Sequence, residues 1–95
     1  MHVSLLRIEM RVPESQSLKA KRAVLRPLIA RLESMRVAVS EVAGQDSWQS
    51  VTLGVAIVAP QPGRVDELLA SVKRALHEDP RIEVVEIAVE HVAAP

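Results

Sequence analysis

Hydrophobic and polar positions alternate in four stretches of the chain and predict four β-strands. An alternation of period two is typical of a strand with one buried face. It is clearest from Leu6 to Val12, where apolar and charged residues alternate. Val3 and Leu5 have the opposite parity, so we expect a bulge near Leu5 or a covered second face there. The predicted strands span residues 3–12, 37–43, 50–59 and 82–92.

Two segments between these strands follow the 3.6-residue period of an amphipathic helix. The first starts after Ser17, a favourable N-cap residue, and runs to about Arg36. Pro27 lies inside this helix and removes one backbone hydrogen bond, so we expect a single helix with a kink. The second helix is expected over residues 65–78, because Pro62 interrupts the chain before it.

The order of these elements, βαββαβ, predicts an α+β, ferredoxin-like fold. Two split βαβ units with right-handed crossovers give a four-stranded antiparallel sheet in the order 4-1-3-2, with both helices on one face. A length of 95 residues suits a single domain, residues 1–95. This topology places the turn after the first strand, the hairpin loop at residues 44–49 and the turn at Asp79 at one edge of the sheet.

The chain is neutral overall, but its charges are unevenly distributed. Twelve Lys and Arg residues balance twelve Asp and Glu residues. Residues 16–36 carry six basic side chains against one acidic side chain, whereas residues 37–95 carry four against nine. A basic helix on an otherwise acidic molecule indicates either a solvated helix face or a surface that binds a polyanion.

Residue types that are absent exclude several kinds of chemistry. The chain has no cysteine, which excludes disulfides, Cys-ligated metals and thiol nucleophiles. It also has no glycine-rich phosphate loop and no nucleophile motif. We therefore predict no catalytic residue, no cofactor and no metal site, although His2 and His91 are expected on neighbouring strands. No apolar run is long enough to span a bilayer and no signal peptide is evident, so we expect a cytoplasmic protein without membrane contacts.

Two clusters are candidate binding residues, and the predicted topology places both at one edge of the sheet. The first lies at the start of the first helix and contains Lys19, Lys21, Arg22 and Arg26. Lys21 falls within the apolar arc of that helix, so it either extends past the sheet edge or faces an anion near the helix N-terminus. Trp48, the single aromatic residue, either caps the core or is an exposed contact. It belongs to the second cluster, the hairpin-loop residues Gln45, Asp46, Trp48 and Gln49.

The sheet face away from the helices is the third candidate surface. Its central strands carry no aromatic residue, which argues against base stacking on the sheet. Small residues beside charges of both signs instead favour a homodimer, with Arg of one copy against Glu of the other. We expect an interface of about 800 Å² per partner. The predicted dimer face contains Arg7, Arg11, Thr52, Gly54, Ala56, Glu86, Ala88 and Glu90.

Four sequence blocks resemble a known bacterial family. They are SLKAKR at 17–22, VSEV at 39–42, QDSWQ at 45–49 and LGVA at 53–56. In this order they are similar to the YlxP-like proteins, a domain of unknown function that is numbered 503. The resemblance covers nearly the whole chain and implies a ferredoxin-like fold in a cytosolic bacterial protein. Genes of that family often lie among those for translation initiation and ribosome maturation, which implies an RNA or ribosomal partner. The resemblance implies no catalytic residues.

The leading hypothesis is a non-catalytic module that binds ribosomal RNA or a ribosome-associated protein through the basic helix. Phosphate contacts by all four basic residues of the first cluster predict a log–log salt slope of about −3 on single strands. The alternative is a small-molecule-binding regulatory dimer with a pocket at its interface. An enzyme is the third class, and it requires Asp46 or Glu41 in a cleft with a perturbed environment.

Overall fold

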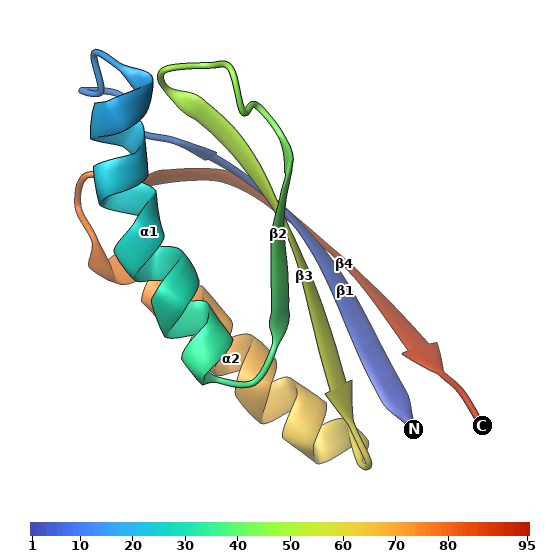
Figure 1. Cartoon of the computed structure of the whole chain (residues 1–95). Coiled ribbons are helices and arrows are strands. Elements are labelled where there is room, and N and C mark those ends of the chain that lie inside the picture. Colours follow the sequence, from blue (N-terminus) through green and yellow to red (C-terminus); the bar gives the residue numbers. More distant parts are fainter.

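Four antiparallel strands form one sheet, and two helices cover one of its faces (Figure 1). The computed structural model describes residues 1–95. Along the chain the elements are β1 (His2–Arg11), α1 (Leu18–Ser34), β2 (Ala38–Ala43), β3 (Ser50–Ala59), α2 (Pro62–Glu78) and β4 (Glu83–Ala93). The strand order is β2-β3-β1-β4, with every neighbouring pair antiparallel. The predicted ferredoxin-like fold is confirmed, because 2-3-1-4 is the order 4-1-3-2 read from the other edge.

The first helix is a single helix as predicted, whereas the second helix starts earlier than expected. The expected start of α2 at residue 65 is wrong, because the helix begins at Pro62. A proline in the first turn removes an N–H that has no partner inside the helix, so it favours a start rather than a break. The other helix, α1, continues unbroken through Pro27. It ends at Ser34 with Met35 as its C-cap, after which Arg36 adopts a left-handed φ of 63° and leads the chain into β2.

The core lies between the helices and the inner face of the sheet. Its twenty buried hydrophobic residues are aliphatic or Met, so the helices and the sheet pack closely without aromatic rings. The even-numbered residues of β1 face this core, and Leu6, Ile8 and Met10 are buried there as the alternation predicts. Leu28 and Leu32 of α1 pack onto the same core.

The expected bulge near Leu5 is wrong, and no other element of the chain covers the second face of the sheet there. Pairing between β1 and β3 is continuous from His2 to Arg11, and the Leu5 side chain is 45% exposed. Leu5 breaks the apolar–polar alternation because the open face of the sheet is itself partly apolar. The register shifts lie elsewhere, at Glu9 in the pairing of β1 with β4 and around residue 42 in the pairing of β2 with β3.

One end of the sheet brings three connections together, as the topology predicts. Arg11 at the end of β1 lies opposite Ser50 of β3 and Glu83 of β4. The start of α1 and the β2–β3 loop therefore lie side by side, at the top of Figure 1. The N–H of Val12 donates to the carbonyl of Gln49 at 2.7 Å, which fastens the loop to the end of β1.

Candidate functional site

The ammonium group of Lys21 is enclosed between α1 and the β2–β3 loop. Its side chain is 2% exposed, and its Nζ donates to the backbone carbonyls of Gly44 at 2.8 Å, Ser50 at 3.0 Å and Ser47. An ammonium has three donors, so all of them are used within the chain. The predicted phosphate contact by Lys21 is therefore wrong. Its position in the apolar arc of α1 directs the side chain inward, onto loop carbonyls rather than onto a ligand.

The backbone of the β2–β3 loop is shaped to offer these carbonyls. Gly44 has a left-handed φ of +84°, and a Cβ there would lie 2.8 Å from the carbonyl oxygen of Ser50, so glycine is required. The Ser47 hydroxyl accepts from the N–H groups of Gln49 and Ser50 at 3.3 Å and 3.0 Å. The loop is thus a turn stabilised by its own hydrogen bonds and folded around the Lys21 ammonium.

This loop presents Trp48 to solvent. The indole is 56% exposed, so the loop tryptophan does not cap the core and is available as a contact. Trp48 follows Ser47, whose carbonyl accepts a hydrogen bond from Lys21. This bond holds the backbone next to Trp48 against the first turns of α1. Gln49 is half-buried, and its Nε2 donates to the carbonyl of Ser15 at 3.3 Å. The other two candidate loop residues, Gln45 and Asp46, are exposed.

Three basic side chains of α1 face solvent: Lys19, Arg22 and Arg26. Their spacing places them along one side of the helix. None of the three takes part in an ion pair within the chain. The first turn of α1 carries no acidic residue, so the partial positive charge of the helix N-terminus adds to theirs. Three of the four predicted basic residues therefore share one exposed side of α1, whereas Lys21 connects the helix to the Trp48 loop.

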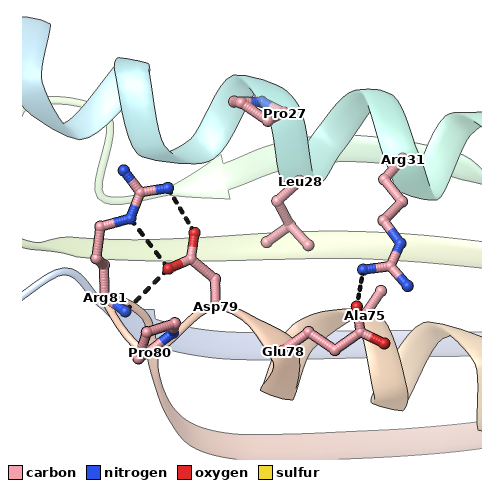
Figure 2. Close-up of a pocket in the computed structure, with 8 residues that line it drawn as sticks. All are labelled: Pro27, Leu28, Arg31, Ala75, Glu78, Asp79, Pro80 and Arg81. Atoms are coloured by element: carbon pink, nitrogen blue, oxygen red, sulfur yellow. Dashed lines mark hydrogen bonds and ion pairs between the residues drawn. The ribbon is translucent and has the colours of Figure 1, made fainter.

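A cleft of about 470 Å³ lies between α1 and the C-terminal end of α2 (Figure 2). Its charged walls are two ion pairs, Arg31 with Glu78 and Arg81 with Asp79. The hydrogen bond from Arg31 lowers the pKa of Glu78, and the hydrogen bonds from Arg81 lower the pKa of Asp79. Because each guanidinium already holds a carboxylate, we assign no ligand to this cleft.

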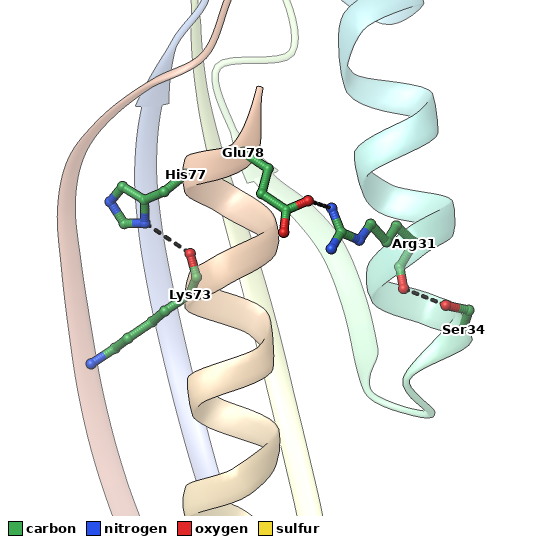
Figure 3. A network of polar contacts seen from close by, with 5 residues as sticks. All are labelled: Arg31, Ser34, Lys73, His77 and Glu78. Carbon is green, nitrogen blue, oxygen red and sulfur yellow. Dashed lines mark hydrogen bonds and ion pairs between the residues drawn. The ribbon is translucent and has the colours of Figure 1, made fainter. Parts of the chain in front are cut away.

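The Arg31–Glu78 pair also connects the two helices (Figure 3). Arg31 lies in the last turn of α1, where the Ser34 hydroxyl donates to its carbonyl at 2.6 Å. His77 of α2 donates from Nδ1 to the carbonyl of Lys73 at 2.8 Å and so stays within its own helix. Arg31 therefore serves helix packing and does not belong to the free basic surface of α1.

His2 of β1 and His91 of β4 line a hollow of about 360 Å³ beside the start of α2. His91 Nδ1 is hydrogen-bonded to the hydroxyl of Ser4, which is fully buried, so this contact satisfies an interior polar group. No three His, Asp or Glu side chains are arranged to hold a metal ion.

Of the carboxylates considered for catalysis, Glu41 is half-buried on the edge strand β2 and Asp46 is exposed. Neither helix has the length and apolarity of a membrane-spanning segment.

The open face of the sheet carries the predicted dimer residues. Arg7 lies between Gly54 of β3 and Ala88 of β4. The next position toward the hairpin end, Glu9, lies between Thr52 and Glu86. The remaining members, Arg11, Ala56 and Glu90, follow in the same registers. The structure thus brings all eight predicted residues onto one uncovered face.

The family model of a protein of unknown function, DUF503, matches residues 3–89. The chain belongs to the DUF503 family. It is 34% identical over 71 residues to the uncharacterised protein YlxP of Bacillus subtilis (strain 168), a match that covers 74% of this chain and 77% of that protein. The family resemblance read from the sequence is confirmed.

Two designed proteins share the architecture. The de novo designed protein Foldit4 has a TM-score of 0.57 and 15% identity, over 98% of this chain and 99% of that chain. The de novo designed protein LFR1 1, which has a ferredoxin fold, has a TM-score of 0.54 and 9% identity, over 97% and 84% of the two chains. At these identities the likeness shows the fold alone.

The sequence analysis missed the carbonyl groups that hold Lys21. Gly44, Ser47 and Ser50 contribute backbone atoms, which leave no side-chain motif to recognise. The available signal was the lysine within an apolar arc, opposite a loop with a glycine at its start. Such a lysine has to find acceptors, because an unpaired buried ammonium is strongly unfavourable.

Replacing Lys21 with Met keeps the apolar stem but leaves three buried carbonyls without a donor. We expect K21M to lower the free energy of unfolding by about 2 to 4 kcal/mol, because unsatisfied buried acceptors are costly. Lys19→Met, on the exposed side of the same helix, is the control and should stay within about 0.5 kcal/mol of the wild type. Urea unfolding followed by circular dichroism measures both, and equal effects would contradict the structural role of Lys21.

Replacing Arg31 with Gln removes the hydrogen bond that lowers the pKa of Glu78. A carboxyl group with a lowered pKa stabilises the fold above its unfolded pKa, and this contribution disappears as the pH falls through the folded pKa. We therefore expect R31Q to raise the pKa of Glu78 toward its ordinary value and to remove this acid-sensitive contribution. The pKa of Asp79 should stay low, because its partner is Arg81. Carbon-detected NMR titration measures both carboxyls, and an unchanged Glu78 would contradict the assignment.

Proposed function

We propose that this protein is a non-catalytic RNA-binding module that uses α1 and the β2–β3 loop. The observation that carries the proposal is the bond between Lys21 and the loop, which connects the loop that exposes Trp48 to the helix that carries the free charges of Lys19 and Arg22. Cationic side chains contact phosphates, and an aromatic ring stacks on a base. A surface that offers both in fixed positions suits a single-stranded stretch of RNA.

The charge distribution supports the same orientation. The free basic residues lie on the outward side of α1, while residues 37–95 carry nine acidic side chains against four basic ones. A polyanion is attracted to the α1 side and repelled by much of the remaining surface. The proposal includes ribosomal RNA as the partner, which the family resemblance favours, and hence a cytoplasmic location.

We further propose that the functional unit is a homodimer formed through the open face of the sheet. Both helices lie on the opposite face, so such a dimer leaves the two copies of α1 exposed on its outer sides (Figure 1). One dimer would then offer two RNA-binding surfaces. Two linked sites raise the apparent affinity for an RNA long enough to reach both.

Because Lys21 is used within the chain, three phosphate contacts remain, from Lys19, Arg22 and Arg26. They predict a log–log salt slope of about −2 on single-stranded RNA, at about −0.7 per phosphate. We expect the double variant K19E/R22E to weaken binding by about tenfold or more, since it replaces two attractions with two repulsions. Fluorescence anisotropy of a labelled single-stranded oligoribonucleotide across a salt titration measures both quantities.

The matched control is K73E/R74E, which makes the same change of net charge on the exposed side of α2. It should bind RNA nearly as the wild type does, because the two residues lie away from the Trp48 loop. A flat salt response, or equal losses in the two double variants, would contradict a specific α1 surface. Binding to ribosomal subunits that free RNA does not displace would point to a ribosomal protein instead.

A further inference from the structure

The open face of the sheet is divided lengthwise into a ridge and a lane. The ridge is the row of long side chains on β1: Leu5, Arg7, Glu9 and Arg11. The lane is the row of small side chains paired with them on β3: Ala56, Gly54, Thr52 and Ser50. Val42 bounds the lane on its far side, since a Cβ on Gly54 would lie 3.0 Å from Val42 Cγ1. A shallow groove of about 360 Å³ lies over the lane, and Leu5 and Val42 flank it.

The same face changes in polarity along the strands. At one end Leu5 and Val58 are 45% and 58% exposed, although they are large hydrophobic residues. The other end carries Arg11, Glu83 and Glu86, and none of these forms an ion pair within the chain. Exposed apolar side chains and unpaired charges of both signs on one face indicate a partner that covers it.

Resting on the homodimer proposed above, we propose that the second copy covers this face through a two-fold axis that runs parallel to the strands between β1 and β3. This axis lays the ridge of each copy in the lane of the other, with Leu5 over Ala56 and Arg7 over Gly54. The axis also places the apolar Leu5 end of one sheet against the Leu5 end of the other. The charged Arg11 ends of the two sheets likewise lie against each other. The arrangement is isologous, so each contact occurs twice.

A two-fold axis across the strands is the other way to stack the two sheets, and it fits poorly. That axis places β1 on β1, so the long side chains of both ridges collide while the two lanes leave a void. It also sets the Leu5 end of one copy against the Arg11 end of the other. Steric fit and polarity therefore select the same axis, the one parallel to the strands.

Area supports a second copy as the occupant. The axis sets each ridge residue level with its own counterpart, so Glu9 of one copy lies diagonally between Arg7 and Arg11 of the other. Glu86 and Glu90 on the flanking strand β4 then form the rim. The four-stranded face measures about 600 Å² in projection. This approaches the roughly 800 Å² of accessible surface that each partner buries in a stable interface.

Intermolecular NOEs in a mixture of isotope-labelled and unlabelled wild-type protein test the proposal directly. We expect NOEs between the methyl groups of Leu5 in one chain and Ala56 in the other. NOEs between Leu5 and Arg11 of different chains would show the crossed axis and overturn the arrangement. A single-chain mass in sedimentation equilibrium at micromolar concentration would overturn the dimer itself. None of these results depends on RNA binding, so the RNA-binding proposal fails separately, and the NOE pattern distinguishes a wrong axis from the absence of a dimer.

A variant that fills the lane gives the second test. Ala56→Arg places a long charged side chain where the ridge of the partner should lie, and we expect it to weaken dimerisation at least tenfold. Ala70→Arg, on the exposed side of α2, is the matched control and should leave the dissociation constant unchanged. Equal dimerisation by A56R and A70R, both folded by circular dichroism, would overturn the proposed interface.

Discussion

The three hydrogen bonds from the Lys21 ammonium to the β2–β3 loop are the contact on which the candidate site depends. A buried charge is unfavourable unless other groups replace its water, and here three carbonyl dipoles do so without a carboxylate. Those dipoles converge because Gly44 adopts a left-handed conformation and Ser47 closes the turn with its hydroxyl. The polar loop that exposes Trp48 is thereby connected to the first helix, in addition to its bonds to the end of β1.

The basic residues of α1 accordingly have two different roles. Lys21 and Arg31 hold the fold together, one by binding the loop and the other by pairing with Glu78 of α2. Lys19, Arg22 and Arg26 have no partner in the chain and define the outward surface. With both helices on one side of the sheet, the α1 surface and the open sheet face point away from each other. A polyanion and a second copy of the chain can therefore be bound at the same time.

Much of the fold follows from local patterns in the sequence. The alternation in β1 identifies its buried residues, and the order of the elements fixes the topology, since the crossovers have one hand. The errors arise where a residue type occurs in two local contexts. Pro62 can end or start a helix, and Leu5 is apolar on a sheet face that no other element of the same chain covers. The role of Lys21 depends on acceptors 23 to 29 residues away, so no local pattern contains it. RNA binding and dimerisation remain predictions, because they concern molecules outside the chain.

The central claim is that a fixed, exposed Trp48 receives an RNA base beside the charges of α1. Its emission is unambiguous, because the chain has one Trp and neither Tyr nor Phe. Titration of the protein with a single-stranded oligoribonucleotide, followed by tryptophan fluorescence, therefore tests the claim most directly. The account predicts saturable quenching that weakens as salt rises, in parallel with binding measured by anisotropy. RNA binding that leaves the Trp48 emission unchanged in intensity and wavelength would contradict it.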